Sequence, residues 1–539
     1  MRASQMLAVW VLAASSSAWA GETIVNPYAP TGRPVHLDFT RLPEPRPDGG
    51  VAFEDLDDYK GRPVLEHPRR GALPAGWVQQ GGVVIPQAVA DGADVRASAL
   101  EVTDAPHPSA ADKVLGPDAA DLCEFPELTP GGVYTGEFKR GSEYPRHGTV
   151  YMNFVGAKMQ SGGENSAENQ SLLALGDDYP YPMYANGEEV AIAVAQAVQA
   201  DFADMAVRVV FAKRPPKMLP YVMIMMGGHY SDTSAGPSGG VAPGADCEDV
   251  GLRNVCYAFV NLQPINAQAN VASQEIGHTM GLGHTYGNDR VMAFGYDTNS
   301  PIDMGFGAEC TEVFIAQGQG AYCAGVNKCH CGSDGKMQHD LRTLQAIYDA
   351  PGPDMIPPTI MITAPTDGAH FESGETVNVT VAPEDDFGGY GWQLVIKNAD
   401  TDKVLAEAPD YDVAQIFSLA GLPDGRYTLL AQVSDHADQI GEHEITITIG
   451  EVASMDSESA PTTSAGEASG EAGGSSGEAS GGSGSTASEE EVDDGCNCRH
   501  TSARGSLALA TLGLLGLRRR RSARELSGHA GPRGARARA

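Results

Sequence analysis

One short stretch of the chain, residues 274–284, carries side chains whose types and spacing could bind a metal ion and move a proton. Gln274 and His278 are four residues apart, so on a helix their side chains point to the same side. Gly281 then allows a sharp turn, after which His284 can return to the same place. Imidazoles gathered in this way bind Zn²⁺, and Glu275 is placed to take a proton from a metal-bound water. The spacing therefore predicts zinc-dependent hydrolysis.

The stretch is similar to the metzincin motif H-E-x-x-H-x-x-G-x-x-H at every position except the first. Met292 lies where that family has its Met-turn. The chain resembles a matrixin-like metzincin over about residues 146–350. The resemblance implies a zinc endopeptidase with Glu275 as general base. It also implies that His278 and His284 are zinc ligands.

Gln274 stands where the family has its first histidine ligand. A glutamine offers only a neutral amide oxygen, a poorer zinc donor than an imidazole nitrogen, so zinc affinity should fall. Three outcomes stay open: Gln274 binds the metal and activity survives, another side chain replaces it, or the domain is a non-catalytic relic that binds partners. The conceivable substitutes, none of which has the motif's spacing, are His229, His330 and His339.

Hydrophobic spacing predicts the elements that position the motif. Apolar residues alternate in several short runs, as in strands, and recur along one face of a helix over 188–205. The motif itself lies on a second helix, over 267–281. This order predicts an α/β (α+β) domain over 146–355 with a helix under a twisted sheet. The predicted strands are residues 150–154, 207–211, 221–226 and 257–262.

Residues 356–450 follow a different pattern, with short strands that alternate Val or Ile with Thr and Asn. About ninety residues of this kind predict an all-β Ig-like sandwich, which resembles the bacterial Ig-like modules that follow secreted enzymes. Its expected role is spacing or weak adhesion. The predicted strands are residues 359–363, 377–381, 392–397, 427–433 and 444–449.

Charge and composition are typical of an exported protein. The chain has 36 basic and 70 acidic side chains, a net charge of −34, which excludes an ordinary nucleic-acid binder. Residues 1–20 have the charge, apolar run and small-residue cleavage site of a secretory signal peptide. Residues 451–494 are Ser, Gly, Ala and acidic residues almost exclusively, and predict a disordered acidic linker or stalk.

The C-terminal end reads as a sorting device. Cys496 and Cys498 precede an apolar run of twelve residues, 506–517, and a cluster of arginines. Twelve helical residues reach about 18 Å, short of the roughly 30 Å hydrocarbon core. Residues 495–521 resemble the MYXO-CTERM tag of exported myxobacterial proteins, with 522–539 as a basic tail. The resemblance implies processing near the cysteines and lipid anchoring at the cell surface or outer membrane; a plain C-terminal membrane anchor is the alternative.

Seven of the nine cysteines lie before the tag. In an exported chain they predict disulfides, with Cys247 and Cys256 as a local closure. A metal clip around His330 is the lesser alternative, and Cys123 is a disulfide partner, a free thiol or a plug for the zinc. The remaining disulfide candidates, after the Met-turn, are Cys310, Cys323, Cys329 and Cys331.

Two further regions leave alternatives open. Residues 21–145 are rich in Pro, Gly and Asp and are an N-terminal extension, a propeptide or a poorly patterned domain. The Gly-rich loop 227–251 carries carboxylates that can bind Ca²⁺, although a solvated acidic loop is the favoured interpretation. These carboxylates are Asp232, Asp246, Glu248 and Asp249.

These observations together predict an exported metzincin-like zinc endopeptidase that cleaves a protein or peptide substrate lying along an edge strand. The alternative is a catalytically inactive surface protein that acts as a binding or adhesion module. The expected cofactor is Zn²⁺ at a weakened site. Peptide specificity and oligomeric state are not predicted.

Overall fold

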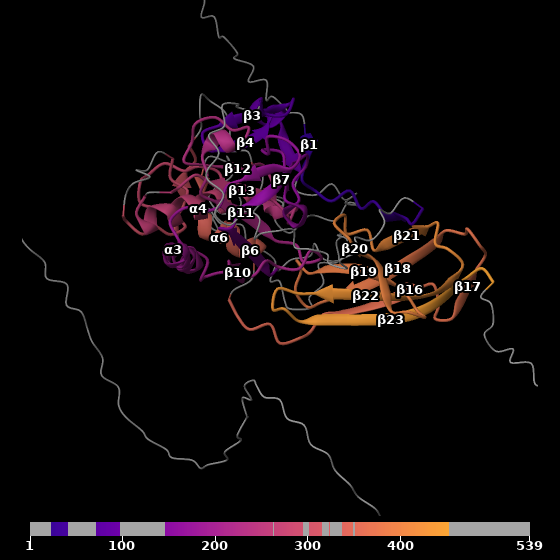
Figure 1. Ribbon diagram of the computed structural model, residues 1–539. Coiled ribbons are helices and arrows are strands. Elements are labelled where there is room, and N and C mark those ends of the chain that lie inside the picture. The colour runs from indigo at the N-terminus through magenta and orange to yellow at the C-terminus, as the bar shows by residue number, and fades with distance from the viewer. Residues whose placement is uncertain are drawn as a thin grey trace, which may run out of the picture. The chain divides into compact units, whose positions relative to one another are not determined.

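The structure is a computed structural model that describes residues 23–40, 72–96, 146–261, 263–294, 301–314, 323, 337–348 and 351–451. The predicted signal peptide, acidic linker, sorting tag and basic tail lie outside the described residues. Within them the fold is mostly β-strand with few helices (Figure 1). None of the helices in this part of the chain has both the length and the apolar character to cross a bilayer.

A seven-stranded sheet organises the region around the motif. Its strand order is β10-β6-β11-β13-β12-β4-β3, with the first four strands parallel and β12 antiparallel to β13. Every residue of β6 is buried, as expected for a parallel strand that is covered on both faces. The strands are β3 (Trp77–Gln80), β4 (Val83–Pro86), β6 (Gly148–Asn153), β10 (Val207–Val210), β11 (Val222–Met226), β12 (Gly240–Pro243) and β13 (Val255–Ala258).

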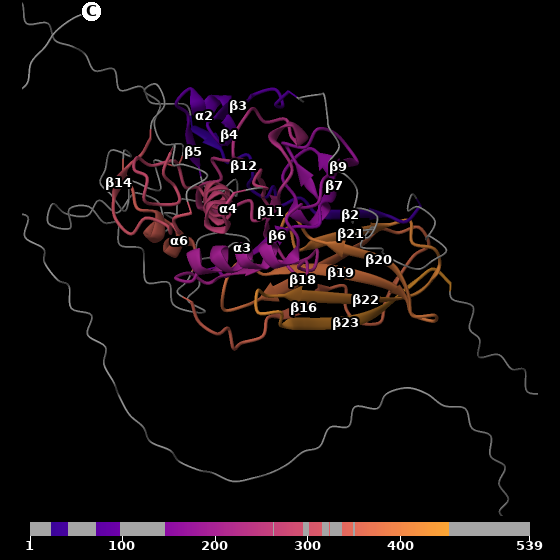
Figure 2. The ribbon, with the colours of Figure 1, turned by 60° about the vertical axis from the view of Figure 1, so that its left-hand side comes forward.

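Two helices, α3 (Glu188–Asp201) and α4 (Ile265–Thr279), pack with the sheet (Figure 2). Successive strand residues face opposite sides, so Met152 packs with the helices while Tyr151 packs in the core on the other face. All residues of α4 from position 267 to 279 are buried. The motif helix is therefore an interior element, and a polar side chain on it that lacks a hydrogen-bond partner is costly.

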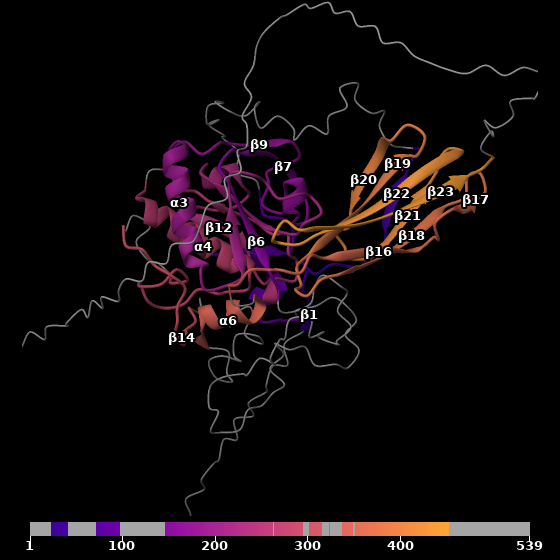
Figure 3. The ribbon, with the colours of Figure 1, turned by 90° about the horizontal axis from the view of Figure 1, so that it is seen from below.

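Residues 359–449 form two sheets that enclose one core, drawn as two layers in Figure 3. Trp392 is fully buried between them. The sandwich is confirmed, and the sequence missed three of its strands, residues 369–371, 403–409 and 416–420. The strands are β16 (Thr359–Ala364), β17 (Ala369–Phe371), β18 (Val377–Glu384), β19 (Gly391–Asn398), β20 (Lys403–Pro409), β21 (Ile416–Ala420), β22 (Gly425–Ser434) and β23 (Ile440–Ile449).

The described parts of the N-terminal segment are integrated into both sheets. Strand β2 (Val35–Asp38) pairs in parallel with β21 of the sandwich. The hairpin β3–β4 extends the seven-stranded sheet beyond β12. The described parts of the segment 21–145 thus pair with strands of both regions. Smaller elements are β1 (Thr23–Val25), α2 (Gln87–Ala90), β5 (Asp94–Arg96), β7 (Ala157–Ser161), β8 (Gln170–Ser171), β9 (Tyr179–Tyr181), β14 (Thr311–Glu312), β15 (Met337–Gln338) and α6 (Asp340–Ile347).

Candidate functional site

Helix α4 and the turn after it bring His278 and His284 together. Their Nε2 atoms are 3.1 Å apart. The turn requires a glycine, because Gly281 has a φ of +94° and backbone atoms of the loop before β13 lie 3.2 Å from where a Cβ would stand. His278 Nδ1 is 2.8 Å from the carbonyl oxygen of Leu282, which fixes Nδ1 as the donor and leaves Nε2 unprotonated.

The paired imidazoles have the protonation state and spacing of zinc ligands. Burial lowers the pKa of His278 to about 4, and burial together with the neighbouring His278 lowers the pKa of His284 well below its usual value. Both rings are therefore neutral at pH 7, the form that binds metals. Two nitrogens bound to one Zn²⁺ at about 2.05 Å in tetrahedral geometry lie about 3.3 Å apart, close to the spacing seen here.

Gln274 occupies the first ligand position but has a structural task. Its Nε2 donates to the carbonyl oxygens of Val291 at 2.9 Å and Ala293 at 3.1 Å, on either side of Met292. Both amide hydrogens are thereby used, so only Oε1 is left to face a metal. Gln274 thus ties α4 to the segment that contains Met292.

Within the described ranges, no histidine, cysteine or carboxylate completes a group of three metal ligands with the imidazole pair. His229 caps a short 3₁₀ helix, with its Nδ1 2.8 Å from Ser231 Oγ. His339 caps α6 and accepts a hydrogen bond from the Arg342 backbone N–H at 3.3 Å. His330 lies outside the described residues. The described candidates for a substitute ligand are therefore helix caps.

Met292 packs directly beneath the motif helix. It is fully buried, and its sulfur would lie 2.7 Å from a Cβ placed on Gly277. A glycine inside a helix costs about 1 kcal/mol relative to alanine, so the close approach of Met292 explains its presence there. Gly277 was not predicted as a site residue, although a glycine between Glu275 and His278 on a helix was the available signal.

Glu275 is a buried carboxyl group with an unmatched oxygen. The residue is 1% exposed, and Oε2 has no hydrogen-bond partner. Burial raises its pKa well above the usual range for a glutamate. Its other oxygen would lie 2.5 Å from a Cβ at Gly240 and 3.2 Å from one at Gly82, so these two glycines make room for it. A carboxyl group kept in such surroundings is typical of a site with a chemical role.

The hairpin β3–β4 covers these residues. Strand β4 pairs in parallel with β12, and the turn at Gly81 and Gly82 reaches the site. A Cβ on Gly81 would stand 3.0 Å from Phe294 and 3.3 Å from His284. Figure 1 shows β3 and β4 continuing the sheet beyond β12. This hairpin was not predicted from the sequence, although two glycines between apolar runs are a hairpin signal.

The cysteine prediction needs a correction. Cys247 forms a disulfide with Cys323, 76 residues away, and not with Cys256. Cys256 is a free, buried thiol on β13 that packs in the core under the helices, whereas Cys247 packs in a different core with residues of β4. Cys310 is also disulfide-bonded. The other candidates, which lie outside the described residues, are Cys123, Cys329, Cys331, Cys496 and Cys498.

The acidic loop before β13 is not solvated, contrary to expectation. Asp246 is fully buried and accepts hydrogen bonds from Asn26 at 2.8 Å and Asn254 at 2.6 Å. Asn254 also donates to the carbonyl oxygen of Thr279 at 3.2 Å, which joins this loop to the end of α4. Asp232, Glu248 and Asp249 are likewise buried. In the described chain these four carboxylates do not assemble into a group of metal ligands.

Comparison with known proteins yields only distant similarities. No family model matches the chain. No curated protein matches it either. Among solved structures, fibronectin(III)-like modules of CbhA from Clostridium thermocellum are 14% identical over 18% of this chain and about half (48%) of that chain, with a TM-score of 0.15. The PKD domain of human KIAA0319 is 16% identical over 20% of this chain and 92% of that chain, with a TM-score of 0.15. OgpA from Akkermansia muciniphila is 11% identical over 58% of this chain and 93% of that chain, with a TM-score of 0.16. Similarities of this strength carry no argument about activity.

Proposed function

We propose that the chain is an exported, surface-anchored, metzincin-like zinc endopeptidase. The observation that carries the proposal is the pair of neutral imidazoles, 3.1 Å apart at Nε2, one on the helix that also holds the buried, unmatched Glu275 and the other after the turn that follows it. His278 and His284 would hold the metal, with Gln274 Oε1 as the candidate third donor. When bound, Zn²⁺ supplies Lewis acidity, which acidifies water and polarises a peptide carbonyl.

The protein's own residues have separate tasks in this proposal. Glu275 Oε2 has no other partner, and with a cation beside it to lower the raised pKa of this carboxyl group it would be the atom that takes a proton from water and returns it to the leaving amine. Met292 and Gln274 hold the ligands in position. Met292 packs on the helix, and Gln274 ties the helix to the segment that contains Met292. Loss of either support would move the histidines rather than remove the chemistry.

The substrate in this proposal is an extended peptide that pairs with β12. One side of β12 pairs with β13, so a peptide could pair only with the other side. In the structure β4 takes this side, with hydrogen bonds from the backbone N–H of Ala242 to the oxygen of Gly82 at 3.0 Å and from Gly244 to Val84 at 2.8 Å. The hairpin must therefore leave before a peptide can pair there, as a propeptide would.

Zinc content and casein hydrolysis test the proposal on the purified, secreted chain, before and after limited proteolysis of the N-terminal segment. The wild type should contain about one zinc and cleave casein, and Glu275→Ala should keep the zinc and lose cleavage. Glu189→Ala, an exposed glutamate on α3, is the matched control and should behave as wild type. If the wild type contains no zinc and does not cleave casein, and only the Gln274→His variant cleaves it, the proposal is wrong for the natural protein.

One observation favours a second candidate, a non-catalytic surface protein that binds partners. The amide of Gln274 is committed to two backbone carbonyls and so stabilises the fold without any metal. In that case the domain and the sandwich act together as a binding or adhesion module. Equal binding of partner proteins by wild type and Glu275→Ala, with no hydrolysis by either, would favour this candidate.

A further inference from the structure

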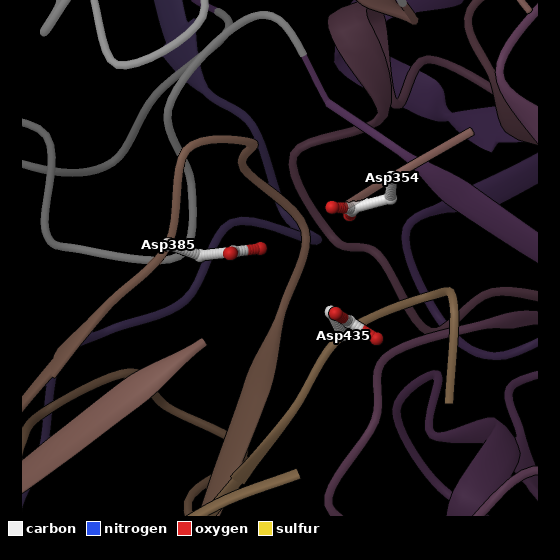
Figure 4. A group of neighbouring side chains, drawn as sticks. All are labelled: Asp354, Asp385 and Asp435. Atoms are coloured by element: carbon white, nitrogen blue, oxygen red, sulfur yellow. The ribbon is translucent and has the colours of Figure 1, made fainter. Parts of the chain in front are cut away.

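Three carboxylates from separate segments meet at one end of the sandwich (Figure 4). Asp354 precedes β16, Asp385 follows β18 and Asp435 follows β22. Each offers one oxygen that lies within 4.8 Å of the other two. In Figure 4 the carboxylates of Asp354 and Asp385 point toward each other, with Asp435 beside the space between them.

These carboxylates are poorly compensated. The side chain of Asp354 is 2% exposed, and its Oδ2 has no hydrogen-bond partner. One oxygen of Asp385 and one oxygen of its neighbour Asp386 are also buried and have no hydrogen-bond partner. His147 is a basic partner of this group, with its Nδ1 3.4 Å from Asp354 Oδ2. In the part of the chain that the structure describes, no lysine or arginine pairs with any of the four aspartates.

The group therefore calls for a positive partner. Burial, followed by the charges of Asp354, Asp386 and Asp435, raises the pKa of Asp385 to about 8. Buried charges of one sign are retained in proteins when they are protonated, paired or bound to a metal. Asp435 is already oriented, since it accepts hydrogen bonds from the backbone N–H groups of Ala437 and Gln439, both at 2.8 Å.

We propose that Asp354, Asp385 and Asp435 bind one Ca²⁺ ion at the loop end of the sandwich. Two oxygens that bind the same Ca²⁺ at about 2.4 Å are at most about 4.8 Å apart, and the three oxygens satisfy that limit. The donors are all oxygens, which selects a hard cation over zinc. Ca²⁺ is favoured over Mg²⁺ because it accepts irregular sets of six to eight oxygens, whereas Mg²⁺ demands a regular octahedron.

The bound ion would join three segments, of which Gln439 already links two, because its Nε2 donates to Asp435 Oδ2 at 3.0 Å and to Asp354 Oδ1 at 3.4 Å. Asp354 lies in the segment that leads into the sandwich, and the other two ligands lie in loops between neighbouring strands. Ca²⁺ would therefore order this end of the sandwich and raise its thermal stability. This role is independent of the histidine pair and of the proposed hydrolysis.

Calorimetric titration of the full, EDTA-treated chain with CaCl₂ tests the site. We expect one site with a dissociation constant of about 10⁻⁵ to 10⁻³ M, weaker binding of MgCl₂, and a higher unfolding temperature with Ca²⁺. Asp385→Asn and Asp435→Asn should each weaken Ca²⁺ binding at least about tenfold. Glu407→Gln, which removes an exposed charge from β20 of the same sandwich, is the matched control and should bind as wild type.

Misfolding of the variants is distinguishable from loss of the ligand. Burial and the neighbouring carboxylates already favour the neutral form of Asp385, so without Ca²⁺ Asp385→Asn should unfold at about the wild-type temperature while losing the Ca²⁺-dependent rise. Hydrogen exchange should slow on adding Ca²⁺ in residues 384–390 and 434–439 of the wild type alone. No heat of binding up to about 10 mM CaCl₂, or unchanged affinity in Asp385→Asn, would overturn the proposal.

Discussion

Gln274→His is the substitution that separates the structural task of this position from its metal-binding task. Without metal the variant should be less stable, because a histidine has at most one N–H for the two carbonyl oxygens that the glutamine amide now satisfies. Loss of one such hydrogen bond in a buried place costs about 1 kcal/mol, which lowers the unfolding temperature of a domain of this size by roughly 2–4 °C.

With zinc the sign should reverse. An imidazole in place of an amide oxygen should tighten zinc binding by about 100-fold or more, since even outer partners of metal ligands change affinity by roughly 10–100-fold. A 100-fold gain is worth about 2.7 kcal/mol when zinc is saturating, which exceeds the lost hydrogen bond. The zinc-loaded variant should therefore unfold at a higher temperature than the zinc-loaded wild type.

Thermal unfolding with EDTA and with zinc, together with zinc competition against a chromogenic chelator, measures both effects. Gln345→His, at an exposed position of α6, is the control and should change neither. An EDTA-treated Gln274→His chain that unfolds with the wild type would contradict the assigned hydrogen-bonding task. Unchanged zinc affinity would show that the first ligand position does not face the metal, and the three-ligand arrangement would then be wrong.

Three more outcomes follow from the same contacts. Gly82→Val should speed casein cleavage, because a side chain there meets Glu275 and a strand carbonyl and should displace the hairpin; cleavage no faster than wild type contradicts its covering role. Cys323→Ala should lower the free energy of unfolding by up to about 4.5 kcal/mol, from the 76-residue separation that the disulfide bridges, and denaturant titration measures this. Burial raises the pKa of Asp201 to about 7. The protonated carboxyl group therefore contributes its full stability below about pH 4, and this contribution is lost as the pH rises through 7. Asp201→Asn should remove that decline in the unfolding temperature; an unchanged pH profile refutes the shift.

The sequence predicted the elements that are long or buried on both faces. Strands such as β6 and the helix α4 have apolar patterns of their own, because the core imposes a period on every buried residue. Strand β12 was missed because it has four residues, begins with glycine and ends with proline within a glycine-rich loop. Its place at the site depends on pairing with β13 and β4, which no local pattern contains.

Partners that are distant in sequence account for the other errors. Acidic residues were expected to be solvated, yet Asp246 is buried because Asn26, 220 positions earlier, and Asn254 donate to it. The expected local closure of Cys247 failed for a related reason. Cys247 packs in a separate core with residues of β4 and with Cys323, whereas alternation of side chains on β13 directs Cys256 into the core under the helices.

The two candidate metal sites differ in their donor atoms, nitrogen in one and oxygen in the other, so they can be tested independently. His278 and His284 are neutral donors whose nitrogens burial keeps unprotonated, so they suit a borderline-soft ion such as Zn²⁺. The aspartates at the end of the sandwich are hard oxygen donors and suit Ca²⁺. A zinc titration monitored at the histidines should therefore be unaffected by millimolar Ca²⁺. Competition between the two ions would mean that one donor set has been assigned to the wrong metal, whichever of the two functions the domain performs.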